Sequence, residues 1–216
     1  MTSHPDIATI ARAAQAHHLA ALGALHLAPD EVPGHQSLVL LGPGGPGFWP
    51  HVSAAPEFAD AAPDPLDRWS HRVITALAHD LGARAIFPWD GPPWPPFTGW
   101  ARRSGRAWPS PVGLLVHDSH GLMLSFRGAL ALPHRLALPA AAARPCDTCA
   151  DQPCRSACPV GALSPDGYDV PACKSDLNRP GNTCMARGCA VRRACPASAG
   201  AARSEAQSAF HMGYFR

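Results

Sequence analysis

The chain has 216 residues, of which 46% are hydrophobic, and this is enough for one large domain or for one medium domain and a second, small one. It has no apolar stretch of about 18 residues and no charged start leading an apolar run, so we expect neither a membrane span nor a secretory signal. We therefore predict a cytoplasmic, reducing location; the net charge of +2 neither indicates nor excludes nucleic acid.

The first part of the chain predicts an α+β domain. The apolar spacing of residues 5–23 is typical of an amphipathic helix, and the short apolar runs at 37–42 and 83–88 indicate strands. Residues 110–132 predict a hairpin, because two β-rich runs flank a turn at 118–121.

The strongest helix signal lies between residues 64 and 82. Asp64 suits the N-cap, Pro65 the first helical position, and Gly82 the C-terminal stop. The residues expected on the buried face of this helix are Leu66, Trp69, Val73, Leu77 and Leu81.

All eight cysteines lie between Cys146 and Cys195. The first run has the spacing C-x2-C-x4-C-x3-C-P, and a later group has the spacing C-x4-C-x5-C-P. Bacterial two-cluster ferredoxins use a C-x2-C-x2-C-x3-C-P run whose fourth cysteine binds the other cluster, so the first run here is two residues longer. In a reducing location this pattern predicts two [4Fe–4S] clusters; the alternatives are zinc sites, disulfides, or one cluster with spare thiols.

The arrangement resembles the iron–sulfur module of epoxyqueuosine reductases and of corrinoid-dependent reductive dehalogenases, in which a lone cysteine separates the two groups. The resemblance covers residues 144–197 and includes "CPVGAL" at 158–163. It implies two ligand sets, namely Cys146, Cys149, Cys154 and Cys195 for one cluster, and Cys158, Cys173, Cys184 and Cys189 for the other.

Residues 64–77, 113–133 and 203–215 resemble the cobalamin-processing proteins that decyanate and dealkylate vitamin B12. This resemblance implies a nitroreductase-like α+β fold with a corrinoid in a large apolar cavity, and a flavin as the less favoured cofactor. It also implies that Arg127 and Gly128 lie at the pocket, where Arg127 meets an anionic group. The alternative for Arg127 is a surface position on an edge strand.

An aromatic block among prolines is the candidate lining of that cavity, or else a core beneath a rigid loop; it contains Phe87, Trp89, Trp94, Phe97, Trp100 and Trp108. His117 and His120 flank the expected turn, where histidines are usually solvated, although either is a candidate to approach cobalt. His17 and His18 are expected to be half-exposed packing residues. No catalytic residue is predicted.

We expect three parts: a corrinoid-binding α+β domain at 1–140, a two-cluster ferredoxin-like domain at 141–200, and a C-terminal helix at 201–216 that packs on the N-terminal domain. The predicted function is an iron–sulfur oxidoreductase that passes electrons to a corrinoid for reductive removal of its upper ligand. The alternatives are a ferredoxin-type carrier without a bound corrinoid and a zinc-stabilised interaction module.

The expected electron donor is a flavodoxin, a ferredoxin or a reductase. Seven Lys or Arg against five Asp between residues 144 and 195 favour an acidic donor. Epoxyqueuosine reductases carry further C-terminal helical repeats that grip tRNA, and this chain stops at Arg216, so no nucleic-acid partner is expected.

Overall fold

The computed structural model describes residues 4–215, which form two compact units. The first unit contains residues 4–106 and 125–141, and the second contains 107–124 and 142–215. Both combine helices with small antiparallel sheets, which confirms the expected mixture of α and β structure. The chain crosses between the units after residues 106, 124 and 141, so the expected boundary at residue 140 lies beside the third crossing. Residues 107–124, which we expected in the N-terminal domain, belong to the second unit.

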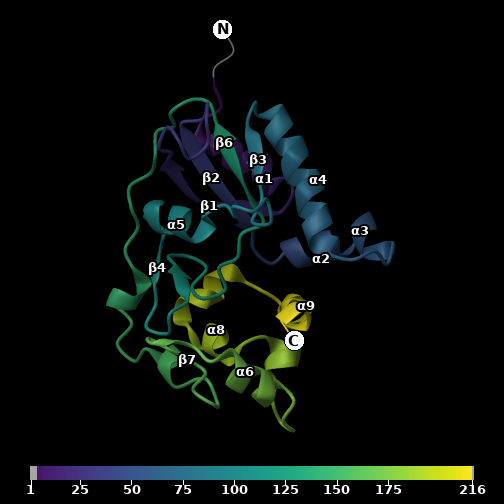
Figure 1. Ribbon diagram of the computed structural model, residues 1–216, viewed down its shortest axis with the longest axis vertical. Coiled ribbons are helices and arrows are strands. Elements are labelled where there is room, and N and C mark those ends of the chain that lie inside the picture. Colours follow the sequence, from purple (N-terminus) through teal and green to yellow (C-terminus); the bar gives the residue numbers. More distant parts are fainter. Residues whose placement is uncertain (1–3, 216) are drawn as a thin grey trace. The chain divides into compact units, whose positions relative to one another are not determined.

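A four-stranded antiparallel sheet with the order β1-β2-β6-β3 is the centre of the first unit (Figure 1). Its strands are β1 (Leu19–His26), β2 (Ser37–Pro43), β3 (Arg84–Ile86) and β6 (Gly128–Leu132). Every residue of the inner strands β2 and β6 is buried. Strands buried on both faces are expected to be apolar throughout, and this explains the uninterrupted run in "SLVLLG".

Five helices accompany this sheet. They are α1 (Ile7–Gln15), α2 (Phe48–Ser53), α3 (Pro56–Ala59), α4 (Pro65–Asp80) and α5 (Phe97–Arg103). Helix α4 packs against β3 and β6, while α1 and α5 contact β1. The core between α4 and the strands includes Trp69, Ile74 and Leu130, which are 1%, 0% and 0% exposed.

Helix α4 begins and ends as the sequence predicted. Pro65 occupies the first turn, and Gly82 has a φ of +61°, which favours glycine after a helix. Asp64 is the N-cap residue, but its φ is +53° and its side chain makes no capping hydrogen bond, so that detail was wrong. On the expected face, four residues are buried and Leu81 is half-buried.

The prediction of one helix over residues 5–23 was wrong. Helix α1 ends at Gln15, His18 takes a left-handed φ of +55°, and β1 then begins at Leu19. The sequence "LAALGALH" is apolar almost throughout, so its periodicity does not separate a helix from a buried strand. Residues 19–26 form a strand because they pair with the apolar strand β2. His17 and His18 are half-buried, as expected.

The second unit consists of short elements around the cysteines. Its strands are β4 (Ala107–Pro109), β5 (Leu115–His117), β7 (Leu163–Ser164) and β8 (Gly167–Tyr168). Its α-helices are α6 (Val170–Leu177), α7 (Cys184–Arg187), α8 (Ala190–Ala194) and α9 (Glu205–Phe215). Its 3-10 turns are η1 (Pro145–Asp147), η2 (Pro153–Arg155) and η3 (Pro196–Ala201).

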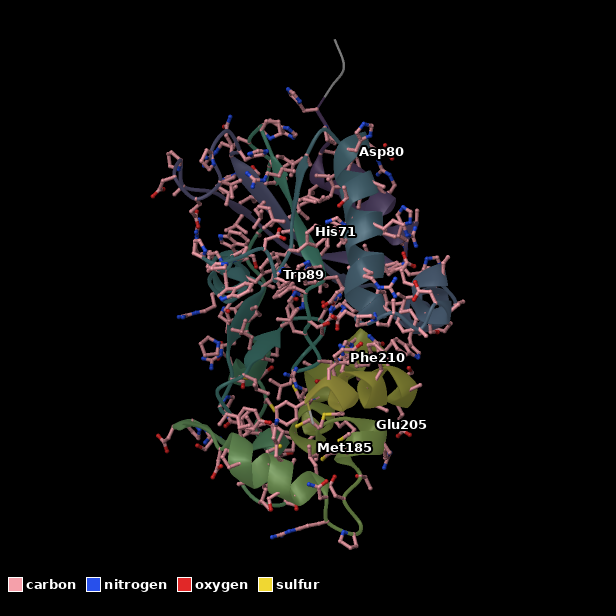
Figure 2. The ribbon with its side chains drawn as sticks, turned by 45° about the vertical axis from the view of Figure 1, so that its right-hand side comes forward. His71, Asp80, Trp89, Met185, Glu205 and Phe210 are labelled. Atoms are coloured by element: carbon pink, nitrogen blue, oxygen red, sulfur yellow. The ribbon has the colours of Figure 1, made fainter. Side chains whose placement is uncertain are left out.

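The C-terminal helix α9 belongs to the second unit, whereas the sequence favoured a position on the N-terminal domain. It packs against α7, as Figure 2 shows for Met185 on α7 and for Glu205 and Phe210 on α9. Glu205 Oε1 accepts a hydrogen bond from Arg187 Nε at 2.5 Å. The helix therefore closes over the segment that carries Cys184 and Cys189.

The expected hairpin over residues 110–132 does not form. Its turn closes, because His117 and Gly121 exchange two backbone hydrogen bonds of 3.0 Å. The strand before the turn, β5, pairs with β4, but the strand after it, β6, pairs with β2 and β3 in the first unit. The two β-rich runs were recognised, but their partners were not, because the pairing is non-local.

None of the helices formed by residues 4–215 combines the length and apolar character that crossing a membrane requires.

Candidate functional site

Four cysteines line one cavity of about 610 Å³ in the second unit, and we call them the first cysteine group: Cys146, Cys149, Cys154 and Cys195. Prolines position three of them. Pro145 and Pro153 each begin a 3-10 turn whose next residue is a cysteine, and Pro196 follows Cys195 directly. Because proline fixes its own φ, it restricts the backbone that carries the neighbouring thiol.

Burial and the proximity of other thiols raise the pKa of two of these cysteines, Cys154 and Cys146. Burial raises the pKa of Cys154 most, and the nearby Cys195, Cys146 and Cys149 raise it further. The pKa of Cys146 is also raised, chiefly by burial and additionally by Cys195 and Cys149, although Arg144 lowers it. Four thiolates in such a place need a compensating positive charge, and a bound metal centre supplies one. The donor set therefore fits a metal–sulfur cofactor.

The remaining four cysteines form a second cysteine group: Cys158, Cys173, Cys184 and Cys189. Burial is the main cause that raises the pKa of Cys173, and the other three thiols raise it as well. Cys173 lies within α6, Cys184 begins α7, and Cys189 is the N-cap of α8. Cys173, which is isolated in the sequence, therefore lies near Cys158, Cys184 and Cys189.

Two sulfurs of the second cysteine group accept hydrogen bonds from the protein. The backbone N–H of Ala162 donates to Cys158 Sγ at 3.3 Å, and the hydroxyl of Tyr168 donates to Cys173 Sγ at 3.2 Å. The Ala162 bond belongs to the turn that contains "CPVGA", since Gly161 N also bonds the Cys158 carbonyl. Donors aimed at sulfur stabilise thiolates, so the second group is also suited to bind a metal centre.

An apolar core packs against cysteines of both groups. Val112, Val116, Leu122, Leu163 and Val191 are buried with Cys154, and partly buried cysteines of both groups pack against them. Val116 and Leu122 also line the cavity of the first group. The residues 107–124 thus contribute directly to the cysteine site, although no cysteine lies in them.

Arg192 lies on α8 between the two groups in sequence, three residues after Cys189 and three before Cys195. Its guanidinium is partly buried and donates to the carbonyl of Leu122 at 2.6 Å. Burial lowers its pKa, whereas the Cys189 thiolate and Tyr168 raise it. Neither Arg192 nor Tyr168 was predicted, although the three-residue spacing of Arg192 from two cysteines was visible in the sequence.

Among residues 4–215, no three His, Cys, Asp or Glu side chains lie close enough together to hold a single metal ion. That finding concerns one ion with all its ligands around one point. The four cysteines of a [4Fe–4S] cluster bind four different iron atoms, so they do not converge on one point.

Arg127 is buried in the first unit, and its guanidinium bonds side chains of the same unit. It bonds Asp67 of α4, donates to Ser70 Oγ at 3.0 Å, and lies 5.6 Å from the ring of Trp89. Burial lowers the pKa of Arg127, and Asp67 opposes that change. The alternative of a surface arginine does not apply, because Arg127 is 8% exposed. A contact with a ligand anion stays a prediction.

Gly128 permits close packing between β6 and α4. A Cβ atom on Gly128 would lie 2.9 Å from Ile74 Cδ1 and 3.2 Å from Phe87 Cδ1. Phe87 stacks between two rings that Figure 2 labels: its ring centroid lies 4.9 Å from that of His71 and 5.1 Å from that of Trp89. Gly128 is therefore surrounded by core side chains.

The aromatic block does not lie in one place. Phe87, Phe97 and Trp100 are buried in the first unit, and Trp94 is 64% exposed. Trp108 is in the second unit, packed against the apolar core beside the cysteines. For the three buried residues, the structure favours the role of core residues.

The two turn histidines differ from each other. His117 is fully buried, with Nδ1 2.8 Å from Asp118 Oδ1, so the expectation of a solvated side chain was wrong there. Both histidines lie within hydrogen-bond distance of Ser119 Oγ, at 3.2 Å for His117 Nδ1 and 3.0 Å for His120 Nδ1. His117 and His120 belong to the second unit.

The geometry of the eight cysteines is the strongest indication of function in this chain, because two groups of four thiols match the ligand number of a [4Fe–4S] cluster. Cysteines far apart in sequence, such as Cys146 and Cys195, are brought to one cavity. Comparison of the chain with known protein families, with curated proteins and with solved structures finds no match.

Proposed function

We propose that the second unit binds two [4Fe–4S] clusters and that the protein is an iron–sulfur electron-transfer protein. The first cysteine group, Cys146, Cys149, Cys154 and Cys195, would hold one cluster. The second cysteine group, Cys158, Cys173, Cys184 and Cys189, would hold the other. A bound [4Fe–4S] cluster supplies one-electron redox chemistry that no protein side chain of this site offers.

One observation carries the proposal. Cys195 lines one cavity with Cys146, Cys149 and Cys154, which precede it in the chain by 41 to 49 residues. Cys158 does not belong to this group and lies near Cys173, Cys184 and Cys189. In two-cluster ferredoxins the fourth cysteine of a run likewise crosses to the other cluster. The resemblance to the iron–sulfur module of epoxyqueuosine reductases implies the same division.

The chain's own residues have three tasks in this proposal. The thiols bind, the apolar side chains of Val116, Leu122 and Val191 exclude water, and donors such as Ala162 N–H orient sulfur lone pairs. Cys154 is 8% exposed, and such burial protects sulfur ligands from solvent. The excess of basic residues in this region favours an acidic electron donor of the flavodoxin or ferredoxin class.

We further propose a corrinoid as the electron acceptor, bound by the first unit. The support is the resemblance to cobalamin-processing proteins, of which residues 64–77 and 125–133 lie in the first unit, whereas residues 113–124 and 203–215 belong to the second. One electron would reduce the Co(III) of this substrate to Co(II), and the upper ligand would leave as an anion. No particular side chain is assigned to that step.

A second candidate is a ferredoxin-type carrier that serves a separate enzyme. It is favoured by the packing of the first unit, where Phe87, Phe97 and Trp100 are core residues and Arg127 is paired with Asp67. In that case the first unit would only support the second or dock a partner.

Metal analysis tests the proposal first. Protein purified without oxygen should contain about eight irons and as many acid-labile sulfides per chain. Zinc without sulfide would overturn the proposal in favour of a structural zinc module. Titration of the intact protein with cobalamin, followed by its visible spectrum, then separates the two acceptors: a saturable spectral change supports the corrinoid, and an unchanged spectrum supports the carrier.

A further inference from the structure

We propose that Arg192 and Tyr168 raise the reduction potential of the cluster held by the second cysteine group. This inference rests on the proposed function and deepens it, because it names the residues that decide how readily one of the two clusters accepts an electron. It follows from where a positive charge and a hydroxyl donor lie relative to Cys189 and Cys173.

The charge of Arg192 is not neutralised by a carboxylate among the described residues. Its bond is to the neutral carbonyl of Leu122, at 2.6 Å, and Cys189, which caps the start of the same helix α8, lies three residues before it. Arginine stays protonated at all ordinary pH values, so this charge is permanent. Partial burial reduces its screening by water, and its field therefore acts on the adjacent sulfurs.

Tyr168 acts through a direct contact. Its hydroxyl donates to Cys173 Sγ at 3.2 Å, and the pKa of Tyr168 is raised, first by burial and then by this bond. The ring is held in place by stacking on Phe215 of α9, with centroids 5.9 Å apart and planes 14° apart. A fixed phenol therefore faces one of the four sulfurs of the second group.

The direction of the effect follows from charge. Reduction adds one electron to the cluster and its thiolates, and no proton enters with it. A nearby positive charge and a hydrogen bond to sulfur both stabilise the more negative, reduced form. Both residues should thus raise the reduction potential, and their loss should lower it.

An EPR-monitored redox titration of the intact protein tests this. In the wild type we expect two one-electron transitions. Arg192→Gln should lower one of them, with about a tenfold drop in the reduced-to-oxidised ratio at a fixed solution potential, while Arg192→Lys should retain most of the wild-type value. Arg179→Gln is the matched control, because it removes the same charge from the second unit at a side chain that is 66% exposed and pairs with Asp176 at 3.8 Å.

Tyr168→Phe provides an independent test, since it removes only the donor to Cys173 Sγ. It should lower the same transition as Arg192→Gln. Cys173→Ser, which changes a ligand of the second group, identifies that transition by altering its EPR signal. Iron and sulfide content, measured in every variant, shows that both clusters are present.

The outcomes separate the two proposals. Full iron content with unshifted transitions in Arg192→Gln and Tyr168→Phe would overturn this inference and leave the electron-transfer function standing. So would a shift of equal size in Arg179→Gln, because only net charge would then matter. A wild-type chain without iron and sulfide would instead overturn the proposed function, and this inference with it.

Discussion

Cys189 and Cys195 begin and end the same short helix, α8, yet they lie in different cysteine groups. Cys195 lines the cavity of the first group, whereas Cys189 lies near Cys173 of the second. One turn and a half of helix therefore connects the two candidate cluster sites. Cys154 belongs to the first group and Cys158 to the second, and they are only four residues apart. The backbone therefore connects the two candidate sites a second time.

Double substitutions test this division of the cysteines. Cys195→Ala should remove one cluster, leaving about four of about eight irons. Adding Cys146→Ala should remove no more iron, because both residues belong to the first group. Adding Cys189→Ala to Cys195→Ala should instead remove nearly all of it. Iron and sulfide analysis, with circular dichroism to show that each variant is folded, gives the answer.

The opposite pattern would contradict the division. If Cys146→Ala with Cys195→Ala lost all the iron, and Cys189→Ala with Cys195→Ala lost only half, then Cys189 and Cys195 would share a cluster.

A cysteine site could be predicted from the sequence because all eight cysteines lie within one short region and two of them are followed by proline. The division into two groups was a prediction from the resemblance and not from the spacing, because Cys195 lies 41 residues or more from the other members of its group. Arg192 and Tyr168 were missed because their role depends on the pairing of β7 with β8 and on the direction of α8, which spacing does not reveal.

The fold of the first unit was predictable where caps and buried runs were strong, as for α4 and β2. It was not predictable where partners are distant in sequence. Strand β6 pairs with β2 and β3 rather than with β5, which precedes it, and the apolar run after His18 becomes β1 only because β2 pairs with it. The role of residues 107–124 as part of the cysteine unit depends on the same non-local choice.

The stability of the first unit should depend on the ionisation of Glu31. A hydrogen bond from Arg103 is the main cause that lowers the pKa of Glu31 to about 2, and Trp100 Nε1 donates to the same oxygen at 3.0 Å. Because the folded pKa is below the ordinary value of 4.5, the stabilisation is present above pH 4.5 and is lost as the pH falls towards 2.

Glu31→Gln should therefore lower the free energy of unfolding by about 2 kcal/mol at pH 7, allowing for the 45% exposure of Arg103. The difference from the wild type should shrink between pH 4.5 and 2. Urea unfolding across this range measures it. Glu205→Gln is the control, because its pair with Arg187 is exposed on both sides and should contribute less than about 1 kcal/mol. A wild-type advantage that persists at pH 2 would refute the assignment.

Asp67 should be needed to keep Arg127 in the core. Asp67→Asn removes a carboxylate that bonds this buried guanidinium, so we expect a loss of about 2 kcal/mol, less than for a fully buried pair because Asp67 is 45% exposed. Asp80→Asn is the control on the same helix; Asp80 is 77% exposed, and Figure 2 labels it at the end of α4. Its effect should stay within about 0.5 kcal/mol. Equal losses in thermal or urea unfolding would contradict the role given to Asp67.

Gly121 is expected to support the first cysteine group, although it is not a candidate metal ligand. Gly121 has a φ of +53°, and a Cβ there would lie 2.3 Å from the backbone nitrogen of Ser198. Ser198 is fixed in turn, because its N–H bonds the Cys195 carbonyl at 2.9 Å and its Oγ accepts from Leu122 N at 3.0 Å. Gly121→Ala should therefore displace the segment that carries Cys195.

We expect Gly121→Ala to cost more than about 2 kcal/mol and to lower the iron content by up to the four irons of the first group. Gly82→Ala is the matched control, since Gly82 in the first unit has a similar φ of +61° but nothing within 4 Å of its added Cβ. It should cost about 1 kcal/mol, the strain of the left-handed backbone alone, and leave the iron content unchanged. If both variants lost iron equally, backbone strain rather than contact with Ser198 would be the cause, and the support that Gly121 gives to Cys195 would have to be abandoned.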